Sequence, residues 1–111
     1  MKGWRTGDFE FHSLEGDFPN KRVFDVRRSR RLVNFAVVSG ETPLQLTKPP
    51  LVLLACNGLT AVKGRALDFS FSVQQVNTSS FEIHCQWGFA DRWPQQDRSI
   101  VYGSWIIVPQ E

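Results

Sequence analysis

The segment between residues 88 and 102 carries the side chains best suited to binding a ligand. It places aromatic rings beside charged groups, at Phe89, Asp91, Arg92, Trp93 and Arg98. An aromatic ring can stack on the apolar C–H face of a sugar, while carboxylate, guanidinium and amide groups hydrogen-bond its hydroxyls. The pattern predicts a sugar-binding surface that includes Phe89 and Trp93. The alternative is that both rings fill a small core within the loop or a contact between subunits.

Residues that could perform catalysis or hold a metal are sparse. Neither His12 nor His84 has a metal-ligand spacing to another histidine or to a cysteine pair. His84 is therefore expected to be solvated or at an interface. The sequence contains no serine nucleophile motif, P-loop, dinucleotide fingerprint or paired carboxylates. We expect a protein that is not an enzyme and that needs no cofactor or metal.

A basic run at residues 21–31 holds Lys21, Arg22, Arg27, Arg28, Arg30 and Arg31. Such a run could bind phosphates, but its apolar residues alternate with charged ones. A solvated strand edge or a subunit rim protected by charge is the favoured interpretation. The formal net charge of the chain is only +2. We therefore expect no nucleic-acid partner.

Length and composition indicate one globular domain covering residues 1–111. The chain has 111 residues, of which 41% are hydrophobic and 13% aromatic, values typical of a β domain with a real core. No apolar run is long enough to cross a membrane, and residues 1–8 do not resemble a secretory signal. We expect a protein that is cytoplasmic as synthesised, without membrane insertion, for which non-classical release is possible. Cys56 and Cys85 are expected to be free thiols.

Period-2 alternation indicates the elements that must position these residues. Residues 67–74 and 81–87 alternate apolar and polar side chains and predict a hairpin. Residues 31–38 predict another strand, residues 8–12 an edge strand, and the apolar run 51–56 a strand central in its sheet. Asn57-Gly58 and Lys63-Gly64 are expected to form a turn. Six or seven short strands without a long crossover favour an all-β antiparallel sandwich, with Trp105 in its core.

Several of these segments, in order and spacing, resemble the H-type lectin domain, the fold of the snail agglutinins. The resemblance rests on Asn57-Gly58-Leu59, Lys63-Gly64, the strand that runs to Val76, residues 81–87 and Ser104-Trp105-Ile106. It is best over residues 31–109 and weaker over 1–30. It implies a six-stranded antiparallel β-sandwich that assembles as a homotrimer. Such trimers bind galactose or N-acetylgalactosamine on glycans and glycoconjugates, at subunit interfaces and without metal.

The resemblance also implies site residues. Asp25 matches the family's N-terminal aspartate, and Trp87 matches its tryptophan. Asp68 occupies the position of the family's arginine, the following loop is longer, and Gly88 or Phe89 replaces the family's histidine. Exchanging a guanidinium donor for a carboxylate acceptor alters the hydrogen bonds offered to a sugar. Arg65, or Arg92 and Arg98 in the longer loop, could restore a donor.

The predicted site therefore comprises Asp25, Arg65, Asp68, Trp87, Phe89 and Trp93. The predicted function is a lectin-like module of galactose or N-acetylgalactosamine type, or of altered specificity. The alternative is a structural or protein-interaction trimerisation domain that has lost sugar binding.

Overall fold

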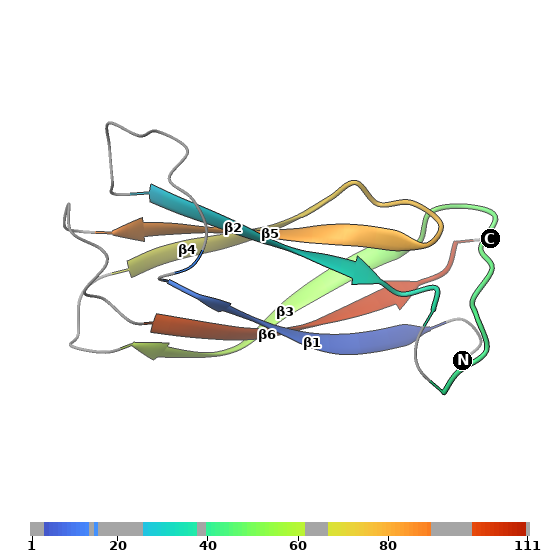
Figure 1. Ribbon diagram of the computed structural model, residues 1–111, viewed down its shortest axis with the longest axis horizontal. Helices are drawn as coiled ribbons and strands as arrows, with labels where there is room; N and C mark the ends of the chain where they lie inside the picture. The colour runs from blue at the N-terminus through green and yellow to red at the C-terminus, as the bar shows by residue number, and fades with distance from the viewer. Residues whose placement is uncertain are drawn as a thin grey trace.

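The computed structural model describes residues 4–13, 15, 26–37, 40–61, 67–89 and 99–110. These residues form six strands in two antiparallel sheets, and no helix occurs among them (Figure 1). The strands are β1 (Arg5–His12), β2 (Val26–Asn34), β3 (Leu51–Ala61), β4 (Leu67–Gln74), β5 (Ser80–Phe89) and β6 (Ser99–Val108). One sheet has the order β1-β6-β3 and the other β2-β5-β4. The predicted all-β class and the antiparallel arrangement in two sheets are confirmed.

The hairpin predicted over residues 67–87 is formed by β4 and β5. Their register pairs Phe69 with Trp87 and Val73 with Ile83, so the apolar positions of both strands share one face. Between the strands, the Asn77 side chain accepts hydrogen bonds from the backbone N–H groups of Ser79 and Ser80, at 2.8 Å each. This side-chain turn closes the hairpin and sets its register.

The basic run enters an edge strand, as expected, but the strand boundaries differ from the prediction. β2 begins at Val26 and ends at Asn34, whereas the apolar run had predicted residues 31–38. Among the described strands β2 pairs with β5 alone, and Arg28 and Arg30 at its outward positions are exposed to water, where charge is tolerated. Apolar content alone therefore placed the strand too late in the sequence.

Two predictions about β3 are wrong. The strand lies at an edge of its sheet, and the central strand is β6. The apolar run is continuous because outward positions are apolar as well, with Leu51 and Leu53 48% and 49% exposed. Asn57-Gly58 is not a turn, since β3 continues to Ala61 with a register shift between Cys56 and Gly58. One extra residue is accommodated as a bulge there.

The core lies between the two sheets. Its fully buried members include Phe11, Phe81, Trp87 and Ile107, and Trp105 is nearly as buried, as predicted. The Trp105 ring meets Phe81 edge-on, with centroids 5.5 Å apart. This contact joins the central strands of the two sheets, β6 and β5.

Two glycines make room for aromatic rings across the β1–β6 pair. Gly7 is the register partner of Trp105, and Gly103 is the partner of Phe9. A Cβ atom added at Gly7 would lie 2.5 Å from the Trp105 indole, and one added at Gly103 would collide with the Phe9 ring. Each ring therefore covers the backbone of the opposing strand.

Cys56 and Cys85 are both free, as predicted. Cys56 is exposed on β3, and Cys85 is buried on β5. Burial raises the pKa of the Cys85 thiol to about 12, with a smaller contribution from Glu15, while Arg31 opposes the change. The Cys85 thiol is therefore protonated at neutral pH. No helix in the described part of the chain is long and apolar enough to cross a membrane.

Candidate functional site

Three of the six predicted site residues lie on the β2-β5-β4 sheet. Asp68 is in β4, and Trp87 and Phe89 are in β5. The register pairs Asp68 with Gly88 and Leu67 with Phe89. Asp25, Arg65 and Trp93 lie outside the described residues.

Three strand ends meet at this position. Gly88 pairs with Val26 on one side and with Asp68 on the other, so β2 and β4 begin where β5 ends. Asp25 directly precedes Val26 in the sequence. The fold thus brings the Asp68 position, Gly88 and the start of β2 to one end of the sheet, although they are distant in sequence.

Trp87 points into the core at this end of the sheet. Its side chain has 0% exposure, and its ring lies against Phe69 with centroids 5.7 Å apart. The indole Nε1 has no hydrogen-bond partner in the described structure, which is uncommon for a buried donor. In the isolated chain, the Trp87 ring is therefore not available to stack on a ligand.

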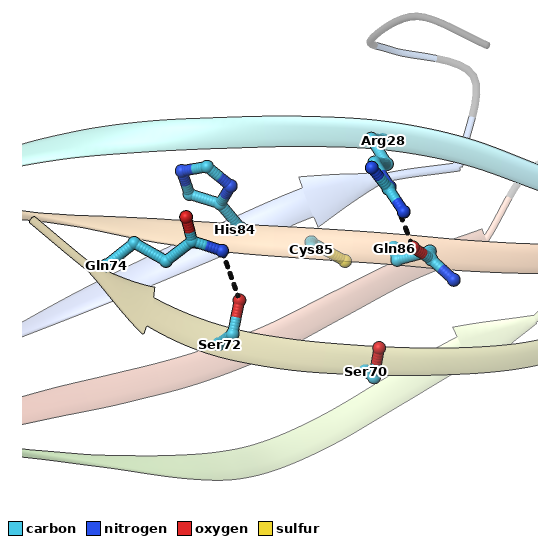
Figure 2. Close-up of a pocket in the computed structure, with 7 residues that line it drawn as sticks. All are labelled: Arg28, Ser70, Ser72, Gln74, His84, Cys85 and Gln86. Atoms are coloured by element: carbon cyan, nitrogen blue, oxygen red, sulfur yellow. Dashed lines mark hydrogen bonds between the residues drawn. The ribbon is translucent and has the colours of Figure 1, made fainter. Parts of the chain in front are cut away.

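The outward face of the same sheet carries a polar groove of about 190 Å³ (Figure 2). Its lining residues come from all three strands: Arg28, Ser70, Ser72, Gln74, His84, Cys85 and Gln86. Register places Arg28, Gln86 and Ser70 in one row across the sheet. The next row holds Arg30, His84 and Ser72. Apart from Cys85, the lining side chains are hydroxyl, amide, imidazole and guanidinium groups.

Hydrogen bonds hold the side chains in the groove. Arg28 Nε donates to Gln86 Oε1 at 2.8 Å, and Gln74 Nε2 donates to Ser72 Oγ at 3.3 Å (Figure 2). His84 Nε2 lies 3.0 Å from Glu82 Oε2, on the same face of β5. These contacts leave further donors and acceptors of the same groups facing solvent.

The groove leads to the end of the sheet where the predicted site residues lie. Asp68, Ser70 and Ser72 occupy successive same-face positions of β4, and Gly88, Gln86 and His84 do so on β5. The Asp68–Gly88 pair is therefore one row beyond Ser70–Gln86. Because Gly88 has no side chain, nothing from β5 rises between β2 and β4 in that row.

Sequence reasoning missed most of the groove. Alternation predicted that Ser70, Ser72, Gln74, His84 and Gln86 face outward, but gave them no role in binding a sugar. Arg28 was considered only as part of the basic run. The signal was the shared parity of polar positions on alternating strands. These polar positions can be recognised as one site only when the order of the strands in the sheet is known.

The other arginines of β2 have structural contacts. Arg31 forms an ion pair with Glu15 at 2.6 Å, and its guanidinium lies 4.6 Å from the centroid of the Phe11 ring. Arg27 is buried and donates to the Ser13 carbonyl at 3.4 Å. Half of the β2 arginines therefore join the two sheets, while Arg28 and Arg30 face outward.

No group of three or more potential metal ligands occurs among the described histidine, cysteine and acidic residues. No protein-family model matches the chain, and no curated protein matches its sequence.

Proposed function

We propose that this chain is a carbohydrate-binding module whose site lies on the outward face of the β2-β5-β4 sheet. The observation that carries the proposal is the continuity between the groove and the Asp68–Gly88 row. Hydroxyl and amide groups both donate and accept hydrogen bonds, as sugar hydroxyls require. Binding of this kind involves no covalent step, so the protein acts as a lectin-like module.

Within this proposal the ligand is of galactose or N-acetylgalactosamine type, with altered preference at Asp68. A carboxylate accepts hydrogen bonds from sugar hydroxyls where the family's arginine would donate them. Trp87 contributes indirectly, from the core side of the sheet. It packs against Phe69 and supports the strand end that carries Gly88. Asp25, Arg65, Phe89 and Trp93 stay in the proposed site on the strength of the sequence alone.

The proposal includes a homotrimer joined through the sheet opposite the groove, so its sites lie away from the subunit contacts and not at the junctions that the resemblance implies. Support comes from the outward face of the β1-β6-β3 sheet, where Leu51 and Leu53 are about half exposed. A hollow of about 370 Å³ on this sheet is lined by Thr6, Leu53, Leu54, Ala55, Ser104, Trp105 and Ile106. The adjoining edge strand, β3, contains no charged residue in 11 positions. Such an edge favours association with another chain.

The same apolar face favours the second candidate, a trimerisation domain without sugar binding. A glycan array separates the two functions. We expect wild-type protein to bind at least one glycan above background, and Asp68→Asn to weaken that binding about tenfold or more by removing a charged acceptor. The matched control is Lys48→Gln, which changes one exposed charge outside the groove.

Equal melting temperatures of the three proteins must accompany the array. If folded wild-type protein at high concentration binds no glycan, the carbohydrate proposal is wrong and the trimerisation domain is favoured. If Asp68→Asn binds as tightly as wild type, the Asp68 end is not part of the site.

A further inference from the structure

On the outward face of the β2-β5-β4 sheet, Arg28 and Arg30 form no ion pair with any described residue. Arg28 is hydrogen-bonded only to the neutral amide of Gln86. The Arg30 guanidinium has no hydrogen bond or ion pair to any described residue. The Glu82 carboxylate contacts His84 at 3.0 Å, and its side chain is only 15% exposed. Two guanidinium groups on the outward face of β2 thus have no acidic partner among the described residues.

The residues of β4 that line the opposite wall are uncharged, and Asp68 follows one row beyond them. Ser70, Ser72 and Gln74 follow one another along β4 and offer hydroxyl and amide groups. Successive same-face positions are about 7 Å apart, since a strand rises roughly 3.3 Å per residue. Arg28 lines the groove on the β2 side, and Arg30 follows in the next row of that strand, just outside the lining. A ligand lying along the groove therefore meets a cationic strand on one side and neutral hydrogen-bonding groups on the other.

This asymmetry distinguishes the groove from a general polyanion surface. Nucleic-acid surfaces combine several cations with exposed aromatic rings on which bases stack. Here the β4 wall matches sugar hydroxyls, and only the β2 wall matches an anion. The planar guanidinium fork pairs well with a carboxylate and also with sulfate oxygens.

We infer that the groove selects acidic sugars, whose carboxylate or sulfate group binds Arg28 and Arg30 while their hydroxyls bind the β4 wall. The inference rests on the proposed carbohydrate function and narrows its ligand class. The inference also predicts that affinity depends on the length of the ligand, because two rows of side chains extend from the Asp68–Gly88 end. An oligosaccharide then binds more tightly than its monosaccharide.

Calorimetric titration with matched probes tests this inference. The probes are trigalacturonic acid, a neutral galactose trisaccharide of equal size, and a sulfated galactose trisaccharide. We expect wild-type protein to bind at least one acidic probe about tenfold or more tightly than the neutral one, with affinity that falls as salt rises. A preference for the uronate over the sulfate indicates that the planar carboxylate is the recognised group, and the reverse indicates the sulfate.

The test variant is Arg28→Gln/Arg30→Gln, which keeps side-chain length and hydrogen-bonding ability but removes both charges. We expect it to bind acidic and neutral probes within about threefold of each other, with an unchanged melting temperature. Lys48→Gln should keep the acidic preference. Arg28→Lys should keep the salt dependence but bind less tightly, because an ammonium cannot form the bidentate pair.

Each other result has a distinct meaning. Equal binding of neutral and acidic probes by wild-type protein overturns the inference and leaves the carbohydrate function standing. No binding of any sugar overturns both. A DNA duplex that binds as tightly as the acidic trisaccharide shows a general anion surface and overturns the inference. An acidic preference that survives in the double variant also overturns the inference. Loss of self-association in that variant overturns it too, because this face would then be a subunit contact.

Discussion

Trp87 is a core residue at the end of the sheet where the site is proposed. It matched a sugar-binding position by resemblance, yet its ring is buried against Phe69. We expect Trp87→Ala to lower the free energy of unfolding by about 3–5 kcal/mol. Trp87→Phe should cost less, on the order of 1–2 kcal/mol, because it keeps an aromatic ring and removes an unpartnered N–H.

Chemical denaturation of both variants measures these losses, and glycan binding at a temperature where both are folded gives the second readout. Retained binding by Trp87→Phe supports a packing role. Lost binding with a native melting curve would instead assign the indole N–H a direct contact.

At the scale of strands, the β1–β6 pair depends on two glycines that face aromatic rings. We expect Gly103→Ala and Gly7→Ala each to destabilise the protein by about 1–3 kcal/mol, because an added methyl group meets the Phe9 or Trp105 ring. Gly58→Ala is the control, since nothing lies within 4 Å of an added Cβ there. Thermal or urea unfolding distinguishes them. Equal stability of all three variants would show that the rings move aside without cost.

How much of the fold could be predicted depended on whether the signal was local. Alternation within residues 67–74 and 81–87 predicted the hairpin and both of its faces, because period 2 needs only neighbouring residues. Strand order was not predictable in this way. β6 is central because it pairs with β1, from the opposite end of the chain, and with β3. Because the outward positions of β3 are apolar as well, its sequence has the continuous apolar pattern of a central strand.

The candidate site was less predictable for the same reason. Arg28 and Gln86 are hydrogen-bonded although 58 residues separate them, and no short motif records such a pair. The sequence marked Asp68 and Phe89, and the register sets these two positions beside Gly88 and Leu67. Asp25, Arg65 and Trp93 lie outside the described residues, and their roles remain predictions.

For the whole molecule, the apolar face at Leu53 predicts self-association. We expect a mass near three chains by sedimentation or light scattering, and Leu53→Lys should shift the protein toward monomer by placing a charge on that face. Leu32→Lys is the matched control, because Leu32 is 71% exposed and lies on β2 of the other sheet. Wild-type protein that is monomeric at micromolar concentration contradicts the trimer, as does equal association of the two variants.

The two sheets form two layers (Figure 1). The groove lies on the outward face of one sheet, and the apolar patch with Leu51 and Leu53 lies on the outward face of the other. Chains that join through their apolar faces leave every groove open to solvent. The proposed trimer would present several copies of the proposed site to a cell surface or a polymer. Linked weak sites gain about 10²–10⁴ in avidity over a single one. Loss of association would then abolish agglutination and capture while single-site affinity stays constant.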